Sequence, residues 1–411
     1  MTQTQVPASH EAQLAKQYAS VDVPKQLSRW QLIAVLACLV FAVLTATIQV
    51  LSWNANRQAA NNTEQLVRVQ NIQSTLFRAD ALATTAFLTG GLEPPEQRAE
   101  YDAAIETITR QIAEAAEAQP ADRDALAALN TAVTDYNATI AQARANNRQG
   151  FPVGAEYLRT ASTGLRDTAV EGSAIPIAQA LVAANAQRAE DELDAQHPFL
   201  LLLPGLAALA VLFWVNRMIA GRFRRRFNVG IVAAFAAVAV LTVVGFFVAA
   251  IQASNNNDLR AGSYDTSYRE STARTAANDA KANESLRLIS RGSGQVYEDR
   301  WVVASQTVED NASDETLPYW ADYVTVHKKV VKTDDGGDYD KAVGLSTNDT
   351  TLDAFDEQSQ QVISDAGFET TDALRSGNTG ILVLAFLTLA IGIAAAGMTI
   401  WGIGQRRREY A

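Results

Sequence analysis

The chain has 411 residues, 48% of them hydrophobic, and a formal net charge of −11. This acidic balance argues against a nucleic-acid-binding protein, because binding to phosphates needs clustered positive charge. Cys38 is the only cysteine, so the chain has no internal disulfide and its domains must be held together by packing.

Charge is absent from four long apolar stretches. About 20 helical residues cross the hydrocarbon layer of a bilayer. We therefore predict membrane spans at residues 31–52, 198–216, 228–252 and 379–404. The first is expected to remain as a signal anchor, because its apolar run is long and no convincing cleavage site follows it. No charge lies within a span, so the sequence does not suggest an ion or proton path.

The segments that flank the spans predict their orientation. Short flanks rich in Lys and Arg stay in the cytoplasm. We therefore expect residues 1–30, 217–227 and 405–411 to be cytoplasmic in a plasma-membrane protein, with the two long loops outside. These inner segments are short, so a signal that crosses the membrane should be received by a separate cytoplasmic protein.

The link between the second and third spans carries five arginines and no acid. They are candidates for contact with a cytoplasmic partner, although setting the topology explains them at least as well. These residues are Arg217, Arg222, Arg224, Arg225 and Arg226.

The first outer loop, residues 53–197, is predicted to be helical throughout. Apolar residues recur every three or four positions in four runs, as in helices that bury one face in a bundle. Breaks at Gly90–Pro95, Gln119–Pro120 and Gly150–Gly154 separate the runs. Short links between four helices predict an up-down four-helix bundle. Pro176 falls within the fourth run, where we expect a kink or a local compensation.

The second outer loop, residues 253–378, is expected to follow the same four-helix plan. Its first run is polar and rich in alanine, and breaks follow at Arg291–Gly294, Leu317–Pro318 and Asp334–Gly337. The acidic stretch TDDGGDYD, residues 333–340, does not have the spacing of a calcium-binding loop. We interpret it as an exposed turn.

Two phrases in the outer loops are similar. FRADALATTAFLTGG in the first loop matches ANDAKANESLRLISRGSG in the second, with Asp80 and Asp279 in corresponding places. LRTASTGL at 158–165 also matches LSTNDTTL at 345–352, and both are expected to open a fourth helix. Two matches in the same order favour internal duplication of a span–bundle–span unit.

Helix geometry predicts a polar site where these phrases meet. At a rise of about 1.5 Å per residue, each aspartate reaches the height of two threonines on the fourth helix. The candidates are Asp80, Thr160 and Thr163 in the first domain, and Asp279, Thr347 and Thr350 in the second. They could form a pocket for a small solute or a partner loop. We favour the alternative that each carboxylate is satisfied by hydroxyls and sets the helix register.

No motif predicts catalysis, a cofactor or a metal site. The histidines, His10, His197 and His327, are scattered along the chain and have no cysteine beside them. We therefore do not expect an enzyme, a bound metal or a cofactor.

The whole chain resembles the four-span membrane component of the actinobacterial protein kinase G nutrient-sensing pathway (GlnX type). The resemblance lies in the repeated span–bundle–span plan and in the phrases RADALATTAFLTGGLEPPEQRAEYD and DAKANESLRLISRGSG. It implies that an extracytoplasmic solute-binding lipoprotein detects an amino acid and that a cytoplasmic Ser/Thr kinase responds. It implies no binding residue, because the family offers no established site motif to match. The outer bundles also resemble the four-helix sensor domains of chemoreceptors.

Two functions remain open from the sequence. A transmembrane signal relay fits the outer bundles and the short inner segments. A structural or scaffolding envelope protein fits the composition equally well, whereas a transporter subunit is disfavoured by unbroken, uncharged spans.

Overall fold

The computed structural model describes residues 23–89, 93–149, 153–167, 172–223 and 228–409, which are almost entirely helical. The chain divides into two compact units. The membrane unit comprises residues 1–56, 194–255 and 376–411, and the outer unit comprises residues 57–193 and 256–375. Helix α2 (Val23–Leu88) and helix α8 (Val229–Leu259) contribute residues to both units.

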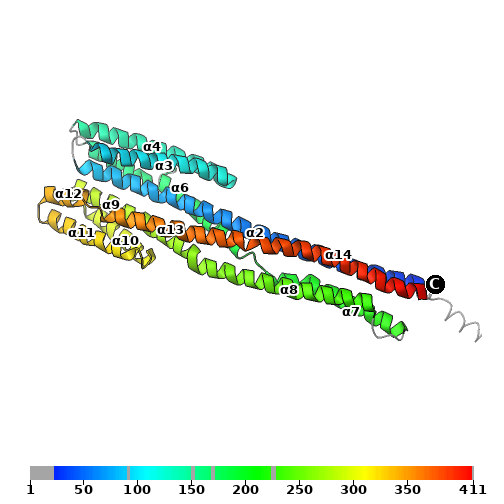
Figure 1. Cartoon of the computed structure of the whole chain (residues 1–411). Helices are drawn as coiled ribbons and strands as arrows, with labels where there is room; N and C mark the ends of the chain where they lie inside the picture. The colour runs from blue at the N-terminus through cyan, green and yellow to red at the C-terminus, as the bar shows by residue number, and fades with distance from the viewer. Residues whose placement is uncertain (1–22, 90–92, 150–152, 168–171, 224–227, 410–411) are drawn as a thin grey trace, which may run out of the picture. The chain divides into compact units, whose positions relative to one another are not determined.

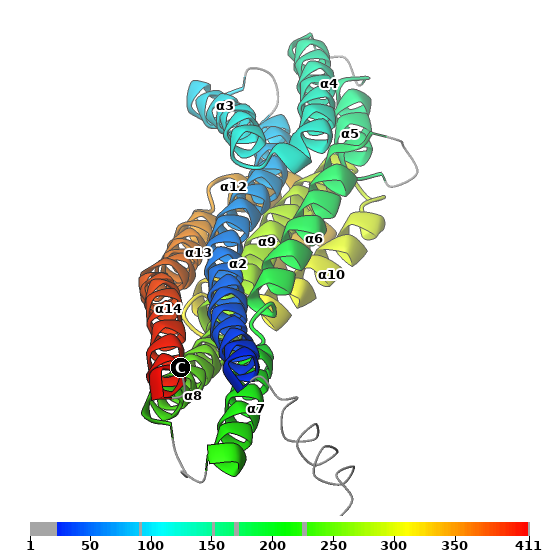
Figure 2. The same cartoon turned by 90° about the vertical axis from the view of Figure 1, so that its right-hand side faces the viewer.

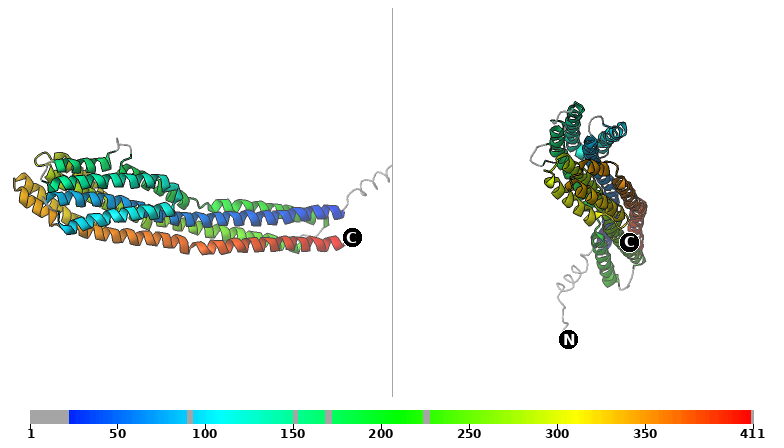
Figure 3. Two further views of the ribbon diagram at one scale, coloured as in Figure 1. Left: turned by 90° about the horizontal axis from the view of Figure 1, so that it is seen from above. Right: turned by 90° about the vertical axis from the view of Figure 1, so that its left-hand side faces the viewer.

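The membrane unit consists of the first parts of α2 and α8 together with α7 (Pro198–Phe223) and α14 (Asn378–Glu409) (Figure 3). All four helices contribute buried apolar side chains to one core. Other large apolar side chains point outward, such as Phe199, Phe213 and Phe386, which are 72%, 61% and 67% exposed. The four expected spans lie within helices that are long and apolar enough to cross a membrane. The chain is therefore a multi-pass membrane protein.

Small residues let these helices approach each other closely. A Cβ atom added at Gly392 of α14 would lie 2.3 Å from the Cβ of Ala42 on α2. A Cβ added at Gly230 of α8 would lie 2.2 Å from the carbonyl oxygen of Met398. Helix association in lipid depends on such close packing, because burial of apolar surface supplies little driving force there.

The first outer domain is a helical bundle. It contains the outer part of α2 and five further segments: α3 (Pro95–Ala118), the short 3₁₀ helix η1 (Pro120–Asp122), α4 (Arg123–Arg148), α5 (Val153–Arg166) and α6 (Ala174–Leu193) (Figures 1 and 2). The apolar positions expected from the helical period form its core, including Ile72, Tyr101, Leu129 and Leu158, each no more than 1% exposed.

The fourth run of this domain is two helices rather than one kinked helix. Helix α5 ends at Arg166 and α6 begins at Ala174, and Gly172 between them has a φ of +90°, a conformation that glycine adopts readily. Pro176 lies in the first turn of α6, where its missing N–H costs no helical hydrogen bond. The expectation of a kink within one helix was therefore wrong.

The second outer domain surrounds a helix that continues from α8 through an irregular π turn, η2 (Arg260–Tyr264). Its helices are α9 (Asp265–Ile289), α10 (Gln295–Asn311), α11 (Leu317–Asp335), α12 (Tyr339–Thr347) and α13 (Thr351–Ser376) (Figure 1). The three expected breaks are present. A further break lies at 348–350, where the Asp349 carboxylate accepts a 3.0 Å hydrogen bond from the N–H of Thr351.

This further break changes the interpretation of the match between LRTASTGL and LSTNDTTL. LRTASTGL lies inside α5, whereas LSTNDTTL crosses from α12 into α13. Neither opens an undivided fourth helix. In the match between FRADALATTAFLTGG and ANDAKANESLRLISRGSG, Asp80 lies on α2 and Asp279 on α9.

Gly392→Val should destabilise the membrane unit by about 1–3 kcal/mol, because the added side chain overlaps Ala42 in a packed interface. The measurement is the unfolding midpoint of the full chain in detergent. Gly397→Val is the matched control on the same helix, since a Cβ there meets nothing within 4 Å. Equal losses in both variants would contradict the packing argument.

Candidate functional site

Asp80 on α2 is completely buried, and both of its carboxylate oxygens accept hydrogen bonds. Its Oδ1 accepts a hydrogen bond from the Tyr136 hydroxyl at 3.0 Å, and its Oδ2 accepts from Ser162 Oγ at 2.7 Å and Arg166 Nη1 at 2.6 Å. Burial raises the pKa of Tyr136 well above its ordinary value, so this hydroxyl remains a donor. The Asp80 carboxylate therefore ties α2 to α4 and α5 inside the first domain.

The hydroxyl that reaches Asp80 belongs to Ser162, not to Thr160 or Thr163. Helix α5 buries Leu158 and Ser162 on one side, and both threonines are exposed. Adjacent helical residues are rotated by about 100°, so Thr163 cannot share the direction of Ser162. Thr160 instead lines a separate cavity beside α4.

Asp279 on α9 is joined to the first domain. Its Oδ1 lies 2.9 Å from Arg166 Nε and 2.7 Å from Arg166 Nη2. Burial alone would lower the pKa of Arg166, but the neighbouring Asp80 and Asp279 carboxylates raise it, so the guanidinium stays charged. The aspartates of the two repeated phrases thus share one arginine, which the sequence analysis did not anticipate.

Thr347 and Thr350 have other surroundings. The Thr347 hydroxyl donates to the carbonyl of Val343 in its own helix, and Thr350 is exposed. Both line a cavity of about 420 Å³ between α2, α9 and the α12–α13 junction. The partner of Asp279 is Arg166, so the expected contact with these threonines was wrong.

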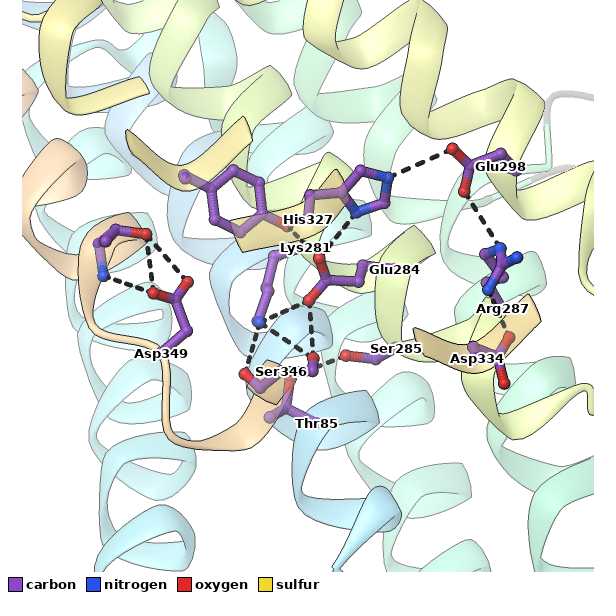
Figure 4. A network of polar contacts seen from close by, with 12 residues as sticks. Thr85, Lys281, Glu284, Ser285, Arg287, Glu298, His327, Asp334, Ser346 and Asp349 are labelled. Atoms are coloured by element: carbon purple, nitrogen blue, oxygen red, sulfur yellow. Dashed lines mark hydrogen bonds and ion pairs between the residues drawn. The ribbon is translucent and has the colours of Figure 1, made fainter. Parts of the chain in front are cut away.

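A larger polar cluster lies one turn beyond Asp279 and centres on Glu284 (Figure 4). Glu284 Oε1 accepts from Lys281 Nζ at 2.8 Å and from Ser346 Oγ at 2.7 Å. Its Oε2 accepts from Tyr323 at 3.3 Å and lies 2.8 Å from His327 Nδ1. Burial alone would raise the pKa of Glu284, but the Lys281 charge lowers it below its usual range. This carboxylate therefore holds α9, α11 and α12 together.

His327 connects this cluster to α10. Its Nε2 lies 3.3 Å from Glu298 Oε1, and its ring stacks on Trp301 with centroids 3.6 Å apart. Burial lowers the pKa of His327, yet hydrogen bonds to Glu284 and Glu298 outweigh burial and raise it above the ordinary value. The two carboxylates therefore favour the protonated imidazole over the neutral one.

Arg287 extends the same cluster to the acidic turn. Its guanidinium lies 3.2 Å from Glu298 and within 2.6 Å of the carboxylates of Asp334 and Asp335. Two aspartates of TDDGGDYD therefore form ion pairs. The sequence contained one signal that was missed: Lys281, Glu284 and Arg287 repeat every three residues, which places alternating charges along one side of a helix.

A third cluster joins α2, α9 and α13. Arg274 donates from Nε to Asp356 Oδ1 and from Nη2 to Asp356 Oδ2, at 2.9 Å each. Arg78 Nη1 also donates to Oδ2, at 2.9 Å. Burial alone would raise the pKa of Asp356, but Arg274 and Arg78 lower it. Arg274 also donates to Asn71 on α2 at 2.8 Å, so this cluster again links the two outer domains.

The arginine link is only partly described. Arg217 is exposed near the end of α7. Arg222 lies in α7 with its side chain outside the described residues, and Arg224, Arg225 and Arg226 fall outside them altogether. Among the described residues, no group of three or more His, Cys, Asp or Glu side chains is placed to hold a metal ion.

Asp80→Ala should lower the free energy of unfolding by about 1–3 kcal/mol, because it leaves the Tyr136 and Ser162 hydroxyls buried without their acceptor, while Arg166 keeps Asp279. Chemical unfolding of the full chain measures this. In double-mutant cycles, Ser162→Ala should couple to Asp80→Ala, whereas Thr163→Val should add independently. Coupling to Thr163 in place of Ser162 would show that α5 is rotated from the position described.

His327 should make stability depend on pH. Since its folded-state pKa is raised, its stabilising charge is fully present below the ordinary histidine value of about 6.5 and is lost as pH rises through the folded-state value. Unfolding midpoints should therefore fall on the alkaline side, and His327→Gln should flatten that fall. His197→Gln, at an exposed site, is the control and should keep the wild-type profile. A profile unchanged by His327→Gln would contradict the ion pairing.

Comparison with known proteins agrees with a sensing role. Residues 55–194 match the family model of an actinobacterial sensor domain. This range coincides closely with the first outer domain, residues 57–193. No curated protein and no solved structure matches the chain. The chain is a multi-pass membrane protein whose first outer domain is similar to an actinobacterial sensor domain, and this similarity points to a sensing or signalling role.

Proposed function

We propose that the protein is a transmembrane signal relay. Its outer unit responds to an extracytoplasmic nutrient, and its membrane unit passes the response to a separate cytoplasmic protein. The observation that carries this proposal is the sensor-domain match at residues 55–194 in a chain with four membrane-crossing helices.

The proposed orientation rests on charge. The segment 217–227 comprises the end of α7 and residues that precede α8, and its charged residues are all basic, so we assign it to the cytoplasm. Both termini then lie on the same side. A link of this length cannot fold as a domain of its own, so it is suited to contact a partner rather than to process a signal.

The proposed partners come from the family resemblance. An extracytoplasmic solute-binding lipoprotein would report amino-acid availability to the outer unit, and a cytoplasmic Ser/Thr kinase would receive the signal. The segments Gly90–Pro95, Gly150–Gly154 and Asp334–Asp340 are the proposed contacts for the lipoprotein, because loops between helices commonly carry binding residues. The first two lie partly outside the described residues.

Internal duplication is part of the proposal. Each outer domain is taken as one four-helix plan whose fourth segment is divided, as α5 with α6 and as α12 with α13. The corresponding aspartates, Asp80 and Asp279, meet at Arg166. Two outer domains of the same plan that pack against each other could combine the inputs that each receives.

Polar bonds between the domains support this coupling. Arg166 binds Asp279, Arg78 binds Asp356, and the hydroxyls of Thr85 and Ser285 lie 2.9 Å apart. These contacts join first-domain helices to α9 and α13 at several heights. A change in one outer domain is therefore expected to alter the other.

The test measures phosphorylation of cytoplasmic kinase substrates after amino acids are added outside the cell. We expect a change in cells that contain the protein and none in cells that lack it. Replacing Arg224, Arg225 and Arg226 with Lys keeps the charge but removes the planar geometry of the guanidinium, so loss of the response would assign these residues to partner contact.

Two controls belong with this test. A reporter active only outside the cytoplasm should work in the Gly90–Pro95 turn and be silent at Arg222 in every variant. If deletion of the protein leaves the phosphorylation response intact but weakens the cell envelope, the scaffold alternative is correct.

A further inference from the structure

One cavity of the outer unit lies between its two domains. It has a volume of about 540 Å³ and is walled by α2 and α6 on one side and by α9 and α10 on the other. Its apolar walls include Phe77, Val182, Val296 and Val303. This volume is within the range of small-molecule sites, which combine apolar walls with a few placed polar groups.

The charge beside this cavity is unbalanced. Asp80 and Asp279 share the guanidinium of Arg166, and Asp299 and Arg300, which also line the cavity, offset each other. One negative charge therefore remains. Asp80 is buried inside the first domain and accepts hydrogen bonds from three donors. Asp279 lines the cavity, and its side chain is 26% exposed. Among the described residues, no second cation forms an ion pair with either carboxylate. The uncompensated charge is therefore accessible from the cavity at Asp279.

Two acceptor atoms at the cavity also lack donors. Both contacts from Arg166 go to Asp279 Oδ1, and no described residue donates to Oδ2. Gln70 also lines the cavity, is 3% exposed, and has an Oε1 atom with no hydrogen-bond partner. A buried acceptor without a donor costs about 1–3 kcal/mol. The cavity thus favours a ligand that brings positive charge and N–H donors.

We propose that this cavity binds a small organic amine with an apolar body. The ammonium group pairs with Asp279, and the apolar part lies against Phe77, Val182, Val296 and Val303. Because Asp279 also holds Arg166, occupancy changes the electrostatic environment of the contact between the outer domains. This would give the proposed relay a direct ligand, but binding itself is tested without any signalling readout.

The probe is 2-phenylethylamine, titrated calorimetrically into the full chain in lipid nanodiscs. 3-Phenylpropionate has the same ring and a carboxylate in place of the amine, and phenylalanine carries both groups. We expect saturable binding of the amine and none of 3-phenylpropionate. Asp279→Asn should weaken binding about tenfold, since a charged hydrogen-bond partner is lost.

A second variant tests the location independently of the Arg166 contact. Val303→Trp fills the cavity from a position that is 69% exposed, so it should abolish binding without unfolding the domain. Val302→Trp is the matched control at the next residue, 54% exposed and outside the cavity lining, and should bind as wild type.

The outcomes separate clearly. Binding of phenylalanine as tightly as the simple amine supports the proposal and points to an amino acid. No saturable binding of either amine, equal binding of 3-phenylpropionate, or binding that survives Val303→Trp would each overturn it. A failed titration leaves the phosphorylation test of the relay unaffected, and a failed relay leaves the binding result standing.

Discussion

The second outer domain depends on the pairing of charges that α9 buries. Most α9 side chains are buried, and several are ionic. An unpaired charge in such a position is strongly destabilising, so each must find a partner on a neighbouring helix. Arg274 pairs with Asp356, Glu284 with His327, and Arg287 with Asp334, whereas uncharged groups hydrogen-bond the others: the Ser313 N–H and Ser359 hydroxyl donate to Glu270, and Lys281 donates to the Ser346 carbonyl. These contacts set the positions of α10 to α13 around α9.

The first outer domain is organised differently. Its core is a continuous apolar cluster drawn from α2 to α6, and two buried carboxylates, Asp80 and Asp122, interrupt it. Asp122 is held by Asn185 at 2.8 Å and by Arg188 at 2.8 Å. Apolar packing tolerates small shifts more readily than a network of directional hydrogen bonds does. The first domain is therefore organised mainly by apolar packing and the second by polar contacts, and Arg166 joins them.

Much of the fold was accessible from the sequence because it depends on local patterns. Long uncharged stretches must be helical in lipid, and the apolar period of three and four residues located the helices and the core of the first domain. The division of the fourth segment was missed at Gly172 and at Asn348–Thr350. Both breaks look compatible with a helix in sequence, and capping and packing decide where a helix ends.

The sequence alone determined the four apolar helices and the helical structure of the two outer loops, because the apolar pattern of a helix can be read from consecutive residues. It also drew attention to Asp80 and Asp279. It did not determine the partners of these aspartates. Helix height placed Thr160 and Thr163 near Asp80, but rotation about the helix axis selected Ser162. Only the tertiary structure brought Arg166 to both carboxylates and His327 between two others, because such contacts join residues far apart in sequence and depend on how the helices pack.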